Sequence, residues 1–206
     1  MSHPPTRHPV PYYSQWESAE LVPEFITGRL DAADDPLWQK SGADSPQEYA
    51  FWAPRMCGVA CLRMALDYAK HPVPPSLPLL HELSAAGAYL RDGNTVKGLI
   101  YQPFADHVTR HYGLAAQACP DLPAHQLPDI IDSGDLVLVS VHKTIRTPDL
   151  DPPGQGGHLA LAVGASAEHV MLHNPSGLPG QSQQFATLTW NRFEHFYATR
   201  GVILHV

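Results

Sequence analysis

Apolar residues recur every three to four positions between residues 57 and 70, which is the period of an α-helix. One face of this helix consists of Val59, Leu62, Leu66 and Ala69, and further apolar residues widen it almost around the circumference. Arg63 and Asp67, four positions apart, are expected to form its one solvated strip. His71-Pro72 ends the helix, because proline cannot continue it. A helix this apolar is predicted to lie through the core.

The pattern changes from helices to strands along the chain. Helices are predicted over residues 77–90, 96–112 and 123–133, with a turn over residues 91–94. Short apolar runs, most of them separated by Gly or Pro, then predict strands over residues 136–141, 158–163, 169–173, 184–189 and 201–206. Helices first and strands later in one chain predict an α+β fold, with a C-terminal antiparallel sheet packed against the buried helix that begins at Cys57.

The first fifty residues are rich in turns. Residues 10–16 are predicted to be a short extended segment, and Pro11 places it at a sheet edge or a strand start. Residues 18–50 are expected to be an insertion that begins with a short helical piece over residues 19–28. No internal repeat is present, and we expect one domain spanning residues 1–206.

Composition limits the classes of function. Hydrophobic residues make up 44% of the chain, which excludes wholesale disorder. The formal net charge is -7 and no Lys/Arg cluster is present, so nucleic acid is not an expected partner. No apolar run approaches the ~20 residues of a membrane span, and the N-terminus lacks the apolar region of a secretory signal. We therefore expect a cytoplasmic protein without a membrane partner; its oligomeric state is left open.

The cysteines point to nucleophilic chemistry rather than to disulfides. Three cysteines, an odd number, do not form a disulfide framework. Cys57 lies where an irregular segment meets the start of the apolar helix, and the free N–H groups and dipole of a helix start stabilise a thiolate. This position predicts a lowered pKa for Cys57, whereas Cys61, one turn later, is expected to be a core residue. A zinc site at Cys57 and Cys61 is the weaker interpretation, because zinc sites use closer pairs and a second pair elsewhere.

A histidine and an asparagine follow downstream in the order used by papain-type enzymes. His158 stands after Gly156-Gly157 at the mouth of an apolar strand, which predicts a base with one exposed ring edge. Asn174-Pro175 follows the next strand, and the Asn174 amide oxygen can orient the His158 ring. Other histidines are expected to be structural (His173 and His205) or to end a strand in solvent (His142).

Together these segments resemble the C39-like family of papain-fold cysteine peptidases. The resemblance lies in Val10-Pro11-Tyr12-Tyr13-Ser14-Gln15, in Trp52 to Leu66, in Asp92-Gly93-Asn94-Thr95 with the helix expected after it, in Gly157-His158, in Asn174-Pro175 and in Trp190 to Phe193. Two features depart from that family. The spacing between Gln15 and Cys57 is long, and the third catalytic position holds Asn where the family often has Asp.

The resemblance implies a hydrolase that cleaves a peptide or related amide bond through an acyl-enzyme. Cys57 would be the nucleophile, His158 the base and Asn174 the residue that orients it. Gln15 and the backbone N–H of Cys57 would donate to the oxyanion. No cofactor and no metal are expected.

Three alternatives remain at this stage. The same acyl-enzyme can be passed to an amine by an acyltransferase or transpeptidase, the fold can serve as a catalytically inactive peptide-binding module, or the thiol and imidazoles can bind a metal. The loop over residues 142–157 has no periodicity and leads into His158. We expect it to form, with residues 18–50 opposite, a wall or lid over the cleft.

Overall fold

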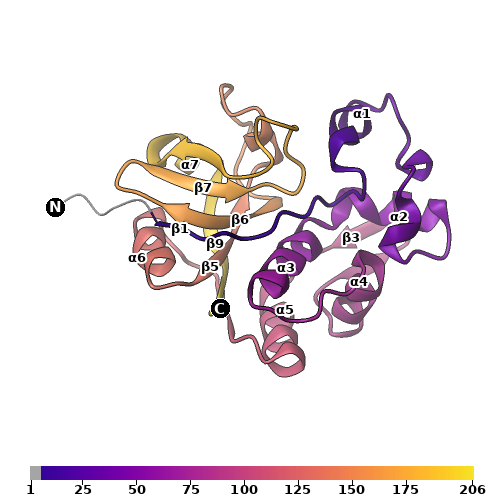
Figure 1. Ribbon diagram of the computed structural model, residues 1–206, viewed down its shortest axis with the longest axis horizontal. Helices are drawn as coiled ribbons and strands as arrows, with labels where there is room; N and C mark the ends of the chain where they lie inside the picture. Colours follow the sequence, from indigo (N-terminus) through magenta and orange to yellow (C-terminus); the bar gives the residue numbers. More distant parts are fainter. Residues whose placement is uncertain (1–5) are drawn as a thin grey trace.

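Helices and strands occupy separate halves of the molecule, as the change of period along the sequence predicts (Figure 1). The computed structural model describes residues 6–206. The helices of the first half are α1 (Val22–Thr27), α2 (Pro46–Trp52), α3 (Cys57–Tyr68), α4 (Ser76–Ala85) and α5 (Tyr101–His107), and single turns of helix lie at Ala19–Leu21, Ala32–Asp34, Trp38–Ser41, Ala53–Arg55 and Val108–Tyr112. In the second half, α6 (Leu127–Asp132) and α7 (Trp190–Phe196) lie beside the sheet, and short helical turns lie at Ala124–Gln126 and Lys143–Arg146.

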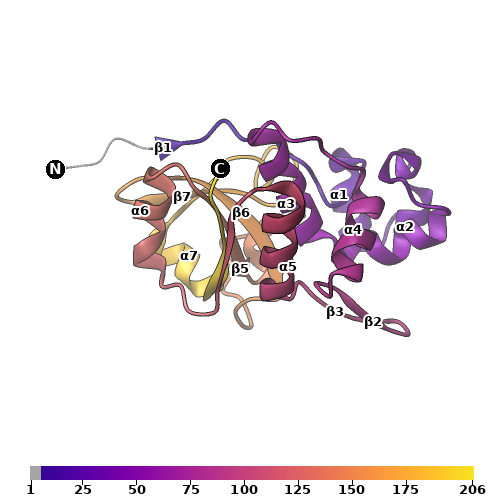
Figure 2. The same ribbon diagram turned by 90° about the horizontal axis from the view of Figure 1, so that it is seen from below.

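The main sheet is antiparallel, with strand order β4-β9-β5-β6-β7-β8, and β1 pairs with the last two residues of β6. Its strands are β1 (Thr6–Arg7), β4 (Ala116–Cys119), β5 (Leu136–Val141), β6 (His158–Ala165), β7 (His169–His173), β8 (Ala186–Thr189) and β9 (Tyr197–Leu204). A separate hairpin, β2 (Leu90–Asp92) with β3 (Thr95–Lys97), projects from the helical half (Figure 2). The sheet therefore places the start of β6, and with it His158, beside the helices.

Helix α3 is the central helix of the core. Its residues from Gly58 to Cys61 are buried, and it packs against both β6 and α4. One apolar cluster joins α3 to the near face of the sheet through residues such as Leu138 and Leu161. A second cluster packs α6 and α7 against the other face, with Ile131 and Phe193 at its centre. Because both faces of the sheet are covered, its central strands β5 and β6 are buried along their whole length.

The structure confirms several predicted elements and corrects others. The helix from Cys57, the two strands β5 and β7 and the antiparallel pairing are as predicted. The predicted helix over residues 77–90 ends early at Ala85, since Gly87 adopts a left-handed φ of 85°. The predicted helix over 96–112 begins only at Tyr101, because residues 95–97 pair in the hairpin instead. The sequence patterns did not predict β4, α2 or α7.

The sequence predicts a short extended segment over residues 10–16, and its placement at a sheet edge or a strand start is wrong. Those residues form no strand; the indigo segment crosses from the sheet to the helical half and runs along α3 (Figure 1). Arg63, expected to be solvated, pairs with Glu17 at 3.6 Å and its side chain is only 12% exposed. Asp67 accepts a hydrogen bond from the Tyr13 hydroxyl at 2.9 Å. The polar strip of α3 thus holds the segment that carries Gln15.

A buried carboxylate ties the residues from 18 to 50 to the same segment. Asp35 is fully buried and accepts hydrogen bonds from the hydroxyls of Ser18 and Tyr49, both at 2.6 Å. The Tyr49 oxygen in turn accepts from the backbone N–H of Glu17 at 2.7 Å. A buried charge is tolerated only when hydrogen bonds satisfy it, so these contacts fix the loop rigidly next to Gln15.

Within residues 6–206, no helix is long and apolar enough to cross a membrane.

Candidate active site

Cys57 is the first residue of α3 and is partly exposed. The turn Ala53–Arg55 leads into it, and Met56 at the N-cap offers no side-chain cap to the first N–H groups. Gly58 is required beside the thiol, because a Cβ there would lie 2.9 Å from the Tyr89 hydroxyl and 3.2 Å from a methyl carbon of Leu159. The start of α3 is therefore packed closely against the start of β6.

The predicted base and its orienting residue are in contact. His158 Nε2 lies 2.8 Å from Asn174 Oδ1, and both side chains are buried. Asn174 Oδ1 also accepts the backbone N–H of Ser176 at 3.1 Å, which holds the amide in place. Since an amide oxygen only accepts, Nε2 carries the proton and Nδ1 is the unprotonated, basic nitrogen. Nδ1 makes no hydrogen bond to any residue of the described chain.

Cys57 and His158 together border two adjoining cavities of about 680 Å³ and about 350 Å³. The larger one is walled by Phe25 and Ile26 from the predicted insertion and by Thr144 and Arg146 from the loop after β5. The start of the 142–157 loop and the 18–50 segment thus face each other across this cavity. Cys57 and His158 thus lie between the helical half and the sheet. The two cavities that they border leave space for different parts of one extended ligand.

Gln15, which the sequence placed at the oxyanion, borders the larger cavity with Cys57. Its backbone N–H donates to the carbonyl of Pro175 at 3.0 Å, and its side-chain Nε2 donates to the carbonyl of Ala53 at 2.9 Å. The side chain is buried, with 4% of its surface exposed. One of the two Nε2 hydrogens is thereby used to fix the amide, and the second is free to donate to a bound group.

The helix start alone predicts a lowered pKa for Cys57, and this prediction is wrong. Burial raises the pKa of the Cys57 thiol, more than the backbone N–H groups of Leu159, Gly58 and Cys57 lower it. Burial likewise lowers the pKa of His158 to about 4, although the hydrogen bond that His158 donates to Asn174 opposes that shift. Apolar packing around Gly58 removes the solvent that a thiolate needs. At neutral pH the site therefore holds a neutral thiol and a neutral imidazole.

The neutral His158 imidazole predicts how activity depends on pH. His158 must be unprotonated to accept the thiol proton, so activity is lost as the pH falls through its pKa of about 4. We expect the acid limb of kcat/KM close to pH 4, well below the ~6.5 of an ordinary histidine. A pH profile of kcat/KM on a neutral substrate measures it. An acid limb at or above the ordinary histidine value would show that His158 is not held neutral by burial.

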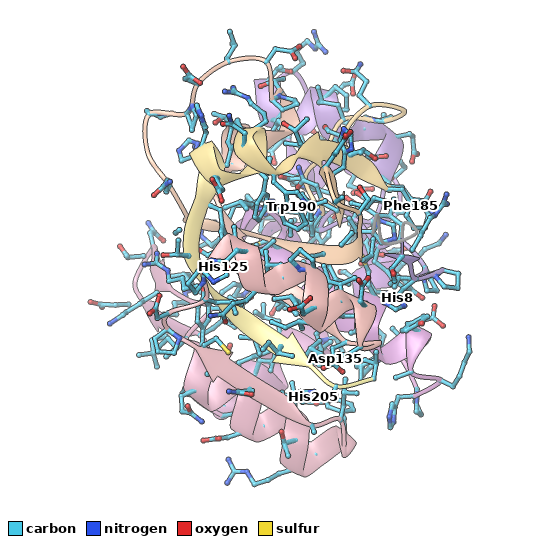
Figure 3. The ribbon with its side chains drawn as sticks, turned by 90° about the vertical axis from the view of Figure 1, so that its left-hand side faces the viewer. His8, His125, Asp135, Phe185, Trp190 and His205 are labelled. Carbon is cyan, nitrogen blue, oxygen red and sulfur yellow. The ribbon has the colours of Figure 1, made fainter. Side chains whose placement is uncertain are left out.

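The other three histidines considered from the sequence pattern have structural roles or lie at the surface. His173 is fully buried, with Nε2 at 2.9 Å from the carbonyl of Val10 and Nδ1 accepting the N–H of Phe185 at 3.0 Å, so neither nitrogen is free. His205 pairs with Asp135 at 2.8 Å at the surface, just beyond the end of β9 (Figure 3). His142 Nδ1 accepts the N–H of Thr144 and caps the turn Lys143–Arg146. These placements leave His158 as the histidine that borders the cleft.

Three polar residues of the site were not predicted from the sequence. The Tyr89 hydroxyl lies at the start of α3 beside Gly58, is buried and makes no hydrogen bond among the described residues. Ser176 Oγ lies 3.2 Å from His158 Nε2. Arg146 donates to Ser176 Oγ at 3.1 Å. Only Ser176, two residues after Asn174, could have been found from its spacing; the other two are brought in by tertiary packing.

The described part of the chain shows no group of three or more His, Cys, Asp or Glu side chains placed to hold a metal ion. Cys61 is buried, with its Sγ 3.8 Å from the carbonyl oxygen of Leu159, and Cys119 is also buried. Neither borders the two cavities. Cys57 is thus the cysteine that a ligand in the cleft can reach.

Comparison with known proteins gives a structural match without sequence support. No protein-family model matches the sequence, and no curated protein matches it. The fold is similar to that in the crystal structure of a proposed C39-like peptidase from Bacillus anthracis. The two share 14% sequence identity and a TM-score of 0.53, and the match covers 74% of this chain and 89% of that one. The likeness supports the family resemblance seen in the sequence, at the level of the fold.

Proposed function

We propose that this protein is a papain-like cysteine hydrolase, built as one domain, that cleaves a peptide or related amide bond. The observation that carries the proposal is the buried hydrogen bond between His158 and Asn174 at the wall of a cleft that Cys57 also borders. Chain order, the start of an apolar helix and an antiparallel sheet behind it agree with this assignment. The structural neighbour is itself a proposed peptidase, which supports the same class of activity.

In the proposed mechanism, Cys57 Sγ attacks the substrate carbonyl carbon while His158 Nδ1 takes the thiol proton. The neutral resting pair makes this general base catalysis, with proton transfer during attack, rather than attack by a thiolate formed beforehand. The carbonyl π electrons move to oxygen, and the free N–H of Gln15 and the backbone N–H of Cys57 donate to that oxyanion.

Collapse of the tetrahedral intermediate breaks the C–N bond. His158 returns its proton to the departing amine, and a thioester of Cys57 remains. A water molecule then attacks the thioester as His158 takes its proton, and the carboxylate product leaves with the thiol restored. Throughout, Asn174 Oδ1 holds the imidazole so that Nδ1 faces the reaction and stabilises the imidazolium between the two steps.

Transfer of the acyl group to an amine is the second candidate. The smaller cavity is also bordered by Cys57 and His158. An amine bound there could attack the thioester in place of water. The test is incubation with a mixed peptide library, with and without an added amine, followed by mass spectrometry. New termini with a gain of one water indicate hydrolysis, and amide-linked products indicate transfer. Peptide binding without any product would identify an inactive binding module.

Replacement of Asn174 separates orientation from base chemistry. We expect Asn174→Ala to reduce kcat by about tenfold to a hundredfold, because the imidazole loses the acceptor that fixes its tautomer. Asn174→Asp should retain more activity than the alanine variant, since a carboxylate also accepts from Nε2. Steady-state kinetics, with circular dichroism to check folding, measure the effect. Equal activity of the two variants and the wild type would remove Asn174 from the site.

A further inference from the structure

The cleft is positively charged in an acidic protein. Basic side chains that border the two cavities are Arg55, Lys97, Lys143, Arg146 and Arg200. No Asp or Glu of the described residues borders either cavity. The whole chain has the opposite balance, with 13 Lys and Arg against 20 Asp and Glu. The side chains around Cys57 and His158 are therefore basic in a protein that is acidic as a whole. We interpret this difference as a sign that the cleft binds an anionic group.

These cations are not neutralised within the described chain. Neither Arg146 nor Lys143 forms an ion pair with a carboxylate; Arg146 donates to the carbonyl of Lys143 at 2.9 Å and to Ser176 Oγ at 3.1 Å. Both acceptors are neutral. A half-buried guanidinium without a counter-charge carries an uncompensated desolvation cost, and burial lowers the pKa of Arg146 accordingly. A carboxylate bound in the cleft would supply the missing partner.

Resting on the proposed function, we propose that the substrate carries a carboxylate, which Arg146 and Lys143 bind in the larger cavity next to the bond to be cleaved. A guanidinium binds a carboxylate through two parallel hydrogen bonds, and Lys143 adds a second, mobile charge. Arg146 reaches His158 through a single hydroxyl, that of Ser176. The carboxylate would therefore bind close to His158.

Part of the wall of the same cavity is apolar. Trp16 and Phe25 stack at 5.9 Å between ring centroids, and Ile26 and Val96 border the same space. A small free acid leaves this surface uncovered, whereas a peptide can cover it with an apolar side chain. The favoured substrate is thus a peptide with an apolar residue and a carboxylate close to the cleaved bond. That carboxylate comes either from an acidic side chain or from a free C-terminus.

The charge of the cleft can be tested without turnover, through alkylation of Cys57. Iodoacetate carries a carboxylate where iodoacetamide carries a neutral amide. The rate of alkylation by iodoacetate divided by the rate with iodoacetamide therefore reports the charge around the thiol. The net charge of -7 by itself would push this ratio below that of glutathione in the same buffer. We expect a ratio above that of glutathione by about fivefold or more, and about fivefold lower in Arg146→Gln.

Lys143→Gln, at an exposed position, should lower the ratio in the same direction, and it serves if Arg146→Gln fails to fold. Arg110→Gln, an exposed arginine outside both cavities, is the matched control and should leave the ratio unchanged. A wild-type ratio at or below that of glutathione overturns the proposal. So does an equal ratio in the Arg146 and Arg110 variants. Because alkylation needs no catalysis, these outcomes are independent of whether the protein hydrolyses peptides.

Peptide pairs then identify the source of the carboxylate. For a cleaved sequence, kcat/KM is compared between Glu and Gln beside the cleaved bond, and between a free and an amidated C-terminus. We expect one of these pairs to differ by about tenfold in favour of the acid, and Arg146→Gln to abolish that preference. Cleavage that ignores both changes would leave the hydrolase assignment intact and overturn the carboxylate preference.

Discussion

The His158→Ala variant is expected to lose about a thousandfold or more in kcat/KM, the largest effect of any change outside Cys57. The structure gives the reason: burial raises the pKa of Cys57, so the thiol stays protonated unless a base removes its proton. In a site with a preformed thiolate the loss would be smaller. Steady-state kinetics on a cleaved peptide measure the effect, and raising the pH should restore part of the lost rate.

His205→Ala is the matched control, because His205 is exposed, pairs with Asp135 and borders neither cavity. It should retain wild-type kinetics. If His158→Ala keeps more than about a tenth of the activity while folded, another group takes the proton. His142, at the end of β5, would then be the next candidate, since both nitrogens of His173 are already engaged.

Gln15→Ala should lower kcat by about a hundredfold to a thousandfold with little change in KM. Its amide is held by the carbonyl of Ala53 before any substrate binds, so the second N–H is oriented in advance. Such a donor acts mainly on the oxyanion, which exists only after attack, and its loss therefore raises the barrier rather than weakening binding. The split between kcat and KM distinguishes this role from a merely structural one.

Gln102→Ala, an exposed glutamine that donates to Asp106, is the matched control and should have no effect. A larger effect of Gln15→Ala on KM than on kcat would place this residue in substrate binding instead. Gln15→Glu should be as slow as the alanine variant or slower, because a carboxylate repels the oxyanion. Retained activity in the glutamate variant would remove Gln15 from the oxyanion site.

Strong local patterns could be predicted from the sequence, and weak ones could not. The helix from Cys57 has a regular apolar period, and the buried strand β5 is a short apolar run rich in valine, which favours a strand. Residues 90–97 carry no such period. They form a hairpin where the sequence predicts the end of one helix and the start of the next, and this hairpin depends on its turn and on packing. The segment around Gln15 is predicted to lie at a sheet edge or a strand start, but its partners are Arg63 and Asp67 on α3, which are remote in the sequence.

The same distinction holds in the cleft. His158 and Asn174 could be predicted because His158 begins one recognisable apolar strand and Asn174 follows the next, and the structure places them in contact. Tyr89 and Arg146 reach the cleft only through the fold, so the spacing of residues gives no indication of them. The pKa of Cys57 was predicted in the wrong direction, because the helix start is visible in the sequence and the burial around it is not.

The most direct test of the account is to trap the acyl-enzyme. The protein is mixed with an activated ester of an acetylated peptide acid, quenched in acid within the first turnover, and analysed by intact mass and peptide mapping. We expect a burst of one leaving group per chain and an acyl adduct on Cys57. The adduct should be absent in Cys57→Ala and retained in Cys61→Ala. An adduct on Cys61 or Cys119, or turnover that persists in folded Cys57→Ala, would contradict the proposed mechanism.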